Sequence, residues 1–225
     1  MAVAASPRRI SLPLAGGSDG AGVAVTPLRT AEMLAMPHFL QRPRGPLPAL
    51  RGLGVLTPKS RWTAVPIPCF LVEHPTAGPL LIDTGMTPAA AAEGARALGR
   101  LAGFAFDVRM EDGWASGEQL AARGIDPLNV GLVVMTHLHF DHAGAVAAYP
   151  HATFVVDQVE WEAAAAGNLL QGYAPALFDH PFDWRTVDFG ARDVGSFASF
   201  ARTVDLFGDG SVRQLSTPGH TKGPL

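Results

Sequence analysis

Cysteine is almost absent from this sequence of 225 residues, in which Cys69 is the only one. A single cysteine excludes an internal disulfide framework and any cysteine-rich metal site. Cys69 stands within the apolar stretch 65–72, so we expect its thiol to be buried and unreactive.

Lysine and long apolar runs are also scarce. Lys59 and Lys222 are the only lysines, and the formal net charge of −3 leaves no basic surface for nucleic acid or for an anionic membrane. No apolar run approaches the ~18 residues that span a bilayer, and residues 1–25 lack the apolar core of a signal peptide. We therefore expect a cytoplasmic protein with neither a nucleic-acid nor a membrane partner.

The residues that are present have the balance of a folded protein. Apolar residues make up 48% of the chain and charged residues 16%, which is typical of a globular rather than a disordered protein. Residues 1–22, rich in Ala, Gly, Ser and Pro, predict a flexible N-terminal arm or a short edge strand. Residues 23–225 predict a single domain without internal repeats or linkers.

Buried strands are predicted to alternate with helices along this domain. Apolar runs predict strands at 65–72, 79–83, 130–135 and 153–156, and the intervening patterns predict helices at 88–101, 143–148 and 158–166. Thr87 is expected to cap the first of these helices, with Pro88 in its first turn. Ser116 is predicted to cap a further short helix, and Asp209 with Gly210 predicts a hairpin turn. This alternation indicates an α/β domain with mixed sheets.

The densest group of metal-ligating side chains directly follows the predicted strand 130–135. His137 and His139 stand two apart on an extended segment, so they point to the same side and can share one metal. Asp141 and His142 follow at the next corner and can face a second metal. Ordinary surface histidines are the alternative interpretation, but crowded imidazolium rings repel one another, whereas a metal makes their crowding favourable.

A third histidine completes the predicted set. His220 follows a Pro-Gly turn, and beside a two-histidine site that needs a third nitrogen we expect it to be a ligand. Three histidines leave an open position for water, which is typical of a catalytic rather than a structural metal. Imidazole and carboxylate ligands suit zinc, and they also accept iron, manganese or cobalt.

These motifs together resemble the metallo-β-lactamase superfamily. Its marks are His-x-His-x-Asp-His after a buried strand, Asp-Thr-Gly after an earlier strand and a later Gly-His-Thr, which stand here at 137–142, 83–85 and 219–221. The resemblance covers residues 50–225, and it implies an αββα sandwich with two divalent metals at one edge of the packed sheets. The most similar branch is the lactonase-like one, which includes the N-acyl-homoserine lactonases, on the stretches 65–68, 80–85, 140–144 and 178–184.

Asp83 opens the Asp-Thr-Gly motif and has three interpretations. The resemblance implies that its carboxylate holds the metal-site histidines in place. Asp-Thr-Gly is also the mark of aspartic proteases, but those enzymes need two such carboxylates, and only one copy occurs here. The third interpretation is a plain turn residue at the end of a strand.

The resemblance implies hydrolysis of an ester-like bond in a small molecule, most of all a lactone, by a metal-bound hydroxide. His137, His139 and His220 are the expected ligands of the first metal. Asp141 and His142 are the expected ligands of the second, and Asp141 also orients the nucleophile. A glyoxalase II-like thioesterase and a degenerate domain that binds metal without turnover are the alternatives. The exact substrate, the native metal and the oligomeric state are left open.

The chain ends soon after His220. Members of the superfamily continue well past Gly-His-Thr, and there they supply a bridging aspartate, a final histidine and, in lactonases, a catalytic tyrosine. Only residues 221–225 follow here, and none of them is Asp or His. We therefore expect a domain whose C-terminal part is missing, which holds at most one metal firmly and turns over slowly.

Overall fold

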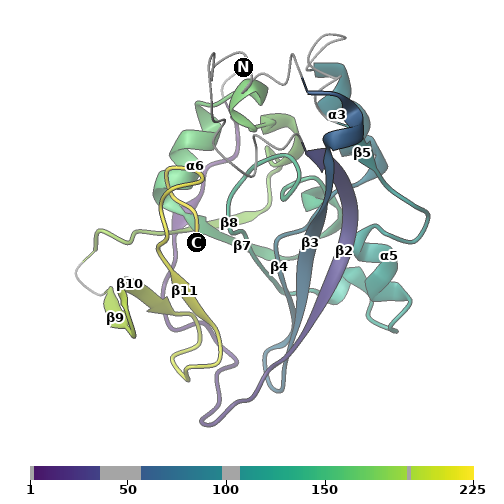
Figure 1. Cartoon of the computed structure of the whole chain (residues 1–225). Helices are drawn as coiled ribbons and strands as arrows, with labels where there is room; N and C mark the ends of the chain where they lie inside the picture. The colour runs from purple at the N-terminus through teal and green to yellow at the C-terminus, as the bar shows by residue number, and fades with distance from the viewer. Residues whose placement is uncertain (1–2, 36–56, 98–106, 192–193) are drawn as a thin grey trace.

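A large mixed sheet forms the centre of the molecule (Figure 1). The structure is a computed structural model that describes residues 3–35, 57–97, 107–191 and 194–225. In these ranges eight strands join in the order β1-β8-β7-β6-β4-β3-β2-β5. Their bounds are β1 Arg8–Arg9, β2 Ala24–Ala35, β3 Thr63–His74, β4 Gly78–Ile82, β5 Asp107–Arg109, β6 Leu132–Val134, β7 Thr153–Asp157 and β8 Asp183–Val187.

The central strands run parallel and bring their carboxyl ends to one edge of the sheet. β4 pairs in parallel with β6, β6 with β7, and β7 with β8. All three residues of β6 are buried, as an apolar strand in the middle of a parallel sheet requires. The loops that follow these strands therefore meet at one edge, where open α/β sheets place their binding sites.

A smaller antiparallel sheet extends from the lower left of the molecule in Figure 1. Its strands join in the order β11-β10-β9, with bounds β9 Gly195–Phe197, β10 Phe200–Asp205 and β11 Arg213–Leu215. Asp205 of β10 pairs with Arg213 of β11, which confirms the hairpin predicted from Asp209 and Gly210.

Three α-helices and several single 3₁₀ turns connect the strands in the described ranges. The α-helices are α3 Pro88–Ala97, α5 Ser116–Ala121 and α6 Gln158–Ala165. The 3₁₀ turns are η1 Lys59–Arg61, η3 Pro127–Asn129, η4 Val146–Ala148, η5 Leu169–Gln171 and η6 Pro175–Leu177. None of these helices has the length and apolar character that crossing a bilayer requires.

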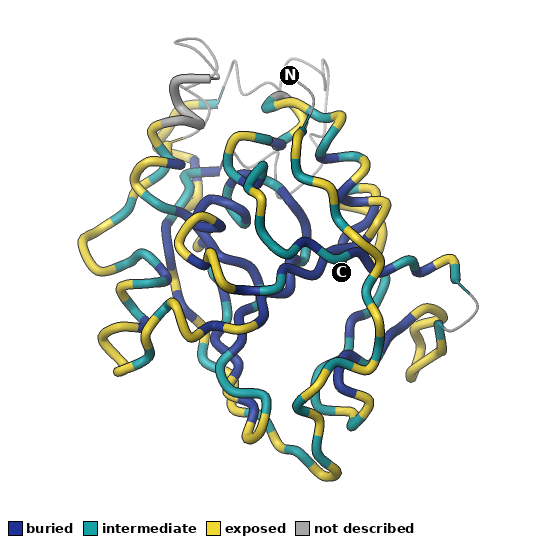
Figure 2. Tube along the Cα trace, turned by 180° about the vertical axis from the view of Figure 1, so that it is seen from behind, coloured by how far each residue is buried: buried dark blue, intermediate teal, exposed yellow. Residues whose placement is uncertain are grey.

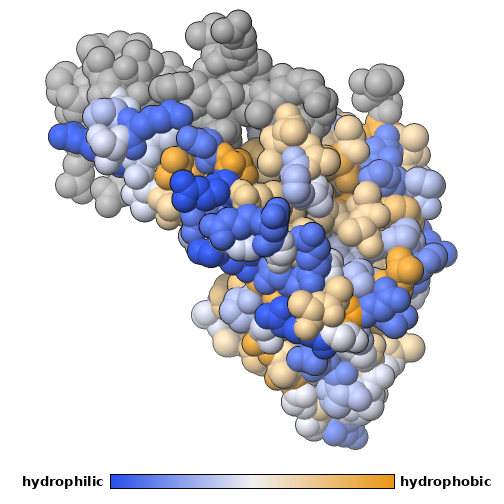
Figure 3. All heavy atoms as spheres, turned by 90° about the vertical axis from the view of Figure 1, so that its right-hand side faces the viewer, coloured by the Kyte–Doolittle hydropathy of each residue, from blue (hydrophilic) through white to orange (hydrophobic). Residues whose placement is uncertain are grey.

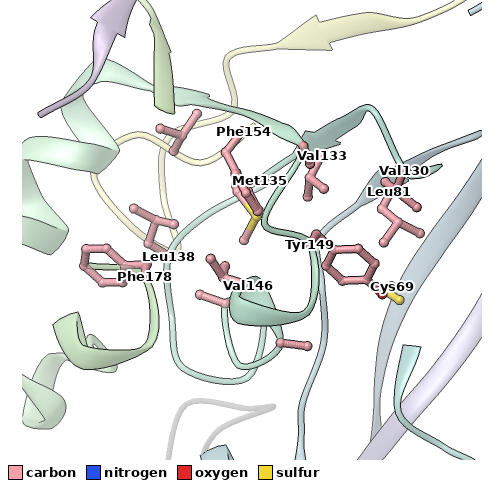
Figure 4. Close-up of a cluster of buried hydrophobic side chains, with 14 of the residues drawn as sticks. Cys69, Leu81, Val130, Val133, Met135, Leu138, Val146, Tyr149, Phe154 and Phe178 are labelled. Carbon is pink, nitrogen blue, oxygen red and sulfur yellow. The ribbon is translucent and has the colours of Figure 1, made fainter. Parts of the chain in front are cut away.

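Successive residues of the central strands point to opposite faces and build two cores. Leu81, Val133 and Phe154 belong to the core on one face, which also contains residues of α5 and α6 (Figure 4). Leu80 and Val155 belong to the core on the other face, which includes residues of β10. Figure 2 shows the same contrast along the chain, because the central strands are buried and the outlying loops are exposed. The sheet is thus covered on both faces, as in a layered α/β sandwich.

Several predicted elements are present. β3, β4, β6, β7 and α6 confirm their predicted positions within a few residues. Thr87 caps α3 as expected, since its hydroxyl accepts a hydrogen bond from the amide of Ala90 at 3.1 Å. The predicted end of this helix near residue 101 lies outside the described residues. Cys69 is fully buried, which confirms that part of its prediction, and burial raises the pKa of its thiol to about 12.

The helix predicted at residues 143–148 is wrong, because only the 3₁₀ turn η4 forms there. Gly144 lies so close to the neighbouring loop that an added Cβ would come within 2.8 Å of the Gly85 carbonyl oxygen and 2.9 Å of the Phe140 carbonyl oxygen. This tight contact between two loops overrides the helical preference of the alanines.

The prediction that Ser116 caps α5 is also wrong, because Ala115 occupies the cap position. The Glu118 carboxylate accepts a hydrogen bond from the Ala115 amide at 3.2 Å. Ser116 instead turns into the core, where its hydroxyl donates to the Thr84 carbonyl oxygen at 2.8 Å and accepts from the Tyr149 hydroxyl at 2.7 Å. The serine that the capping pattern suggested therefore links two parts of the core.

Residues 3–14 lie against the large sheet and its cores, and the Ser18 amide donates to the Asp209 carboxylate in the hairpin of the small sheet. β1 pairs in parallel with β8 at the edge of the large sheet, and Ile10, Leu12 and Leu14 pack on the core that contains Leu80. The Asp179 carboxylate accepts a hydrogen bond from the Ala5 amide at 2.7 Å. A boundary between an arm and a domain at residue 22 stays a prediction.

The side of the molecule formed by β2 and α5 carries mixed chemistry. Figure 3 shows hydrophilic and apolar side chains interspersed on this face rather than segregated. Large apolar side chains that are exposed, such as Val25 and Leu128, occur at scattered positions. Scattered apolar exposure is ordinary for a folded protein and indicates no binding surface by itself.

Phe154→Ala is expected to lower the free energy of unfolding by about 3–5 kcal/mol, because it leaves a cavity in the core that contains Leu81 and Val133. Phe154 is fully buried, and its ring stacks on Trp184 at a centroid distance of 4.6 Å. Phe197→Ala is the matched control, because this ring is 54% exposed. Its cost should stay below about 1 kcal/mol. Urea unfolding followed by tryptophan fluorescence measures both, and equal losses would contradict the assignment of Phe154 to the core.

Candidate metal centre

Three loops meet at the carboxyl edge of the sheet and carry the predicted site residues. Residues 83–85 follow β4, residues 136–144 follow β6, and residues 216–225 follow β11. The Gly85 loop touches the second of these loops directly through an isolated bridge to Ala143. The parallel order of β4 and β6 is what places the first two loops side by side.

His137, His139 and His220 surround one point, as the sequence predicted. One nitrogen from each ring can be chosen so that all of them lie within 4.8 Å of one another. The ring centroids are 4.7 Å apart for His137 and His139, 5.0 Å for His137 and His220, and 4.9 Å for His139 and His220. Three imidazoles at nearly equal separations are the arrangement of a three-histidine metal site.

His137 has the chemical state that a metal ligand needs. It is buried, and burial together with the neighbouring histidines holds the pKa of its imidazole far below the ordinary value. Its Nε2 atom is buried without a hydrogen-bond partner among the described residues. A buried nitrogen lone pair left without a donor is costly unless a cation fills the role, so the ring fits a divalent metal.

Leu138 explains why His137 and His139 face the same way. Its side chain is fully buried and lies beside Phe178 in the core that contains Val133 (Figure 4). Because neighbouring side chains on an extended segment alternate, the inward Leu138 directs both histidines away from the core. The two-residue spacing read from the sequence therefore has the predicted geometric result.

Asp141 and His142 form a second group beside the first. The Asp141 Oδ2 atom lies 3.5 Å from His142 Nε2, and the His142 ring lies 4.0 Å from the His137 ring. Burial opposes the charged form of His142, but the carboxylates of Asp83 and Asp141 outweigh it and raise the pKa of this imidazole to about 9. Without a metal the ring is therefore protonated at neutral pH, and its Nε2 can join the Asp141 carboxylate as a ligand only when a metal displaces that proton.

Asp83 connects the loop after β4 to both of these groups. It is almost fully buried, and its Oδ2 accepts hydrogen bonds from His142 Nδ1 at 2.8 Å and from the Thr136 hydroxyl at 2.7 Å. Its Oδ1 accepts from the Thr136 amide at 2.7 Å. Because its Nδ1 is bonded to Asp83, His142 can offer only Nε2 to a metal. The Asp83–His142 hydrogen bond is the support of a metal-site histidine that the superfamily resemblance implied.

Thr136 is a site residue that the sequence reasoning missed. Its hydroxyl donates its single proton to Asp83, so the His137 Nδ1 atom 3.0 Å away must in turn donate to the hydroxyl oxygen. This chain of bonds fixes the tautomer of His137 and leaves the lone pair on Nε2. No motif marks Thr136, although its place between the buried strand and His137 is the signal that could have identified it.

Gly172 and Tyr173 were missed as well. Gly172 has a φ of +87°, and an added Cβ would lie 2.7 Å from the His139 ring. The Tyr173 ring packs edge-on against the same imidazole at a centroid distance of 4.9 Å. Both residues confine His139, and they stand in an irregular segment where periodicity carries no information.

The aspartic-protease interpretation of Asp83 finds no support in this geometry. Both carboxylate oxygens are occupied by Thr136 and His142, and the residue is 3% exposed. A protease carboxylate must reach the substrate and share a proton with a second carboxylate. Asp83 also has a φ of +60°, an uncommon value for a residue other than glycine, which is the mark of a position held by its surroundings.

A family model supplies the comparison that decides the fold family. The model of the metallo-beta-lactamase superfamily matches residues 62–225. The chain belongs to the metallo-beta-lactamase superfamily. The αββα sandwich that the resemblance implied is therefore confirmed as the fold class.

Similar proteins within the superfamily include two proteins named N-acyl homoserine lactonase AttM. The chain is 34% identical to the one from Agrobacterium fabrum over 162 residues, which cover 71% of this chain and 57% of that protein. It is 33% identical to the one from Azorhizobium caulinodans, with the same coverage. The chain thus spans little more than half the length of these relatives.

The fold is also similar to solved structures of the superfamily. One is an N-acyl homoserine lactone hydrolase with the product N-hexanoyl-L-homoserine bound at its catalytic metal centre. The likeness has a TM-score of 0.65 at 22% identity, and it covers 89% of this chain and 67% of that one. At this identity the likeness shows the superfamily fold alone.

His137→Ala should abolish tight zinc binding, because the first site loses one of three nitrogen donors. We expect the zinc dissociation constant to rise more than about 100-fold. This exceeds the loss caused by mutating a residue that only supports a ligand. His139→Ala should behave in the same way. Titration against a chelating dye measures the affinity, and His151→Ala, in an exposed turn, is the control. Normal zinc content in both ligand variants would refute the site.

Asp83→Asn should weaken zinc binding by about 10–100-fold without unfolding the domain. Asparagine tolerates the positive φ, but its amide nitrogen cannot accept the bonds that Thr136 and His142 donate. Asp112→Asn, at an exposed position, is the matched control. Wild-type affinity in Asp83→Asn would favour the plain turn residue, whereas retained zinc with a lost peptidase activity would favour the protease.

Proposed function

We propose that this chain is a divalent-metal hydrolase that opens a lactone ring, with N-acyl homoserine lactones as the substrate class. The observation that carries the proposal is the convergence of His137, His139 and His220, with the buried Nε2 of His137 left without a hydrogen-bond partner in the described part of the chain. Three imidazole ligands that leave a fourth position for water are the features of a catalytic metal site.

Zinc is the metal that we propose for the three-histidine group. Imidazole nitrogen is a preferred ligand of zinc, and three such ligands with water in the fourth position recur in zinc hydrolases. Asp141 and His142 would hold a second divalent ion beside the first, as the mixed oxygen and nitrogen donors allow. A bound divalent metal lowers the pKa of water toward 7 and polarises a carbonyl group, which is the chemistry that ester hydrolysis needs.

The side chains of this protein have distinct tasks in such a reaction. Asp141 is partly exposed, so its carboxylate can accept a hydrogen bond from the attacking water and hold the proton that water gives up. As water oxygen bonds to the lactone carbonyl carbon, the ring carbon–oxygen bond breaks, and the ring oxygen takes up a proton to become a hydroxyl group. Asp83 and Thr136 keep the histidine rings oriented during these steps.

An apolar cluster beside the site supports an acyl substrate. Phe140, inside the metal-binding loop, and Met86, directly after the Asp-Thr-Gly loop, are buried in this cluster. Partly buried Leu169, Ala174 and Leu177 pack against it. An acyl chain that lies against these partly buried side chains would bury apolar surface on both partners, which favours binding. The names of the AttM relatives support the same substrate class.

Hydrolysis of N-hexanoyl homoserine lactone should exceed hydrolysis of a penicillin, as measured by kcat/KM for ring opening. Removal of the metal with a chelator should abolish the activity, and added zinc should restore it. The exposed-turn variant His151→Ala should match the wild-type protein, whereas His220→Ala should lose activity.

Three outcomes would contradict this function. Faster turnover of the penicillin would reverse the ranking of substrates. Faster turnover of S-lactoylglutathione would favour the thioesterase. Tight zinc binding without hydrolysis of any of the three would favour a degenerate metal-binding domain.

A further inference from the structure

Glu160 is a completely buried ionisable residue that the proposed hydrolysis does not use. It lies in the first turn of α6, and its side chain has no exposed surface. A buried carboxylate is costly unless hydrogen bonds hold it. The helix does not need Glu160 for its cap, because the Asp157 carboxylate already accepts hydrogen bonds from the amides of Val159 and Glu160. Another role must account for its burial.

The Glu160 carboxylate receives hydrogen bonds from two separate segments. Oε1 accepts from the Leu138 amide at 3.0 Å, and Oε2 accepts from the Gly223 amide at 3.4 Å. Both partners are donors, which matches a carboxylate that can only accept. The Tyr173 side chain lies near the same carboxylate.

Each of these contacts leads to a histidine of the first site. Leu138 is the residue between His137 and His139, so its amide fixes the backbone that carries both rings. The Tyr173 ring packs against the His139 ring. Glu160 therefore supports the buried side of the two-histidine loop.

The loop that carries His220 depends on the hydrogen bond from the Gly223 amide to Glu160. His220 itself is exposed, so its own burial does not hold it in place. The Thr217 amide donates to the Pro224 carbonyl oxygen at 3.0 Å and closes the loop. Gly223 then presses the closed loop against α6, where an added Cβ would lie 2.6 Å from the Glu160 nitrogen. Only glycine fits this contact, and the Glu160 carboxylate bonds to its amide.

We propose that Glu160 is a positioning residue of the first metal site, which joins the His137–His139 loop and the His220 loop through one buried carboxylate. Its negative charge also lies behind the histidines and favours a divalent cation between them. The inference rests on the proposed metal site and adds a residue outside the three motifs. Glu160 touches neither the metal position nor the reacting atoms, so it acts through the ligands.

Glu160→Gln tests this role, with Glu162→Gln on the same helix as the matched control. Glutamine keeps the shape, but its amide nitrogen cannot accept from Leu138 or Gly223, and the charge is lost. We expect the zinc dissociation constant of the full chain to rise by about 10–100-fold. The visible spectrum of bound Co²⁺ should change as the ligand geometry loosens. Glu162 is exposed, and its carboxylate accepts a hydrogen bond from the Gln158 side chain on the surface of the helix, so its variant should match the wild-type protein.

A merely structural role predicts a different result. In that case Glu160→Gln lowers the melting temperature of the metal-free chain but leaves the zinc affinity and the Co²⁺ spectrum unchanged, and the proposal is overturned. If Glu160→Gln does not fold, Gly223→Ala carries the test, because its added Cβ forces the His220 loop away from the Glu160 carboxylate. We then expect a loss of about threefold to tenfold in zinc affinity. An unchanged affinity would overturn the proposal.

The outcome is separable from the lactonase proposal. Weakened zinc binding in Glu160→Gln, together with a wild-type chain that hydrolyses no lactone, would support Glu160 and refute the lactonase. A wild-type chain that binds no zinc would refute both.

Discussion

The Asp83 carboxylate is the contact on which the arrangement of the metal centre depends. It sits at the end of β4 and accepts hydrogen bonds from Thr136 at the end of β6 and from His142 further along the same loop. Through the Thr136 hydroxyl it also sets the tautomer of His137. One buried side chain thus orients a ring of each proposed metal group, at the place where two parallel strands end side by side.

The sheet makes this contact possible, and the cores on its faces keep the sheet in register. Leu81 and Val133 pack in one core, while their neighbours Leu80 and Leu132 pack in the other. A slip of one residue would exchange the faces and move the loops apart. The metal loop is tied to the same packing, because Leu138 enters the first core between the two histidines that leave it.

Two buried carboxylates flank the histidines from different directions. Asp83 approaches from β4 and bonds to the side chains of Thr136 and His142, whereas Glu160 approaches from α6 and bonds to the backbone amides of Leu138 and Gly223. Both oppose the positive charge that a divalent metal would bring. The imidazoles of His137 and His139, whose pKa values are lowered chiefly by burial, therefore lie between two carboxylates that do not ligate.

The sequence by itself determined the candidate ligands and the strands that present them, because ligand type, two-residue spacing and apolar runs are local properties. It also identified Asp83, since the Asp-Thr-Gly motif is continuous. Tertiary structure decided the rest. Thr136, Gly172 and Glu160 act through contacts with residues distant in the chain, and residues 143–148 form a turn because Gly144 packs against a neighbouring loop. Such contacts depend on which segments the sheet brings together, and no local pattern records them.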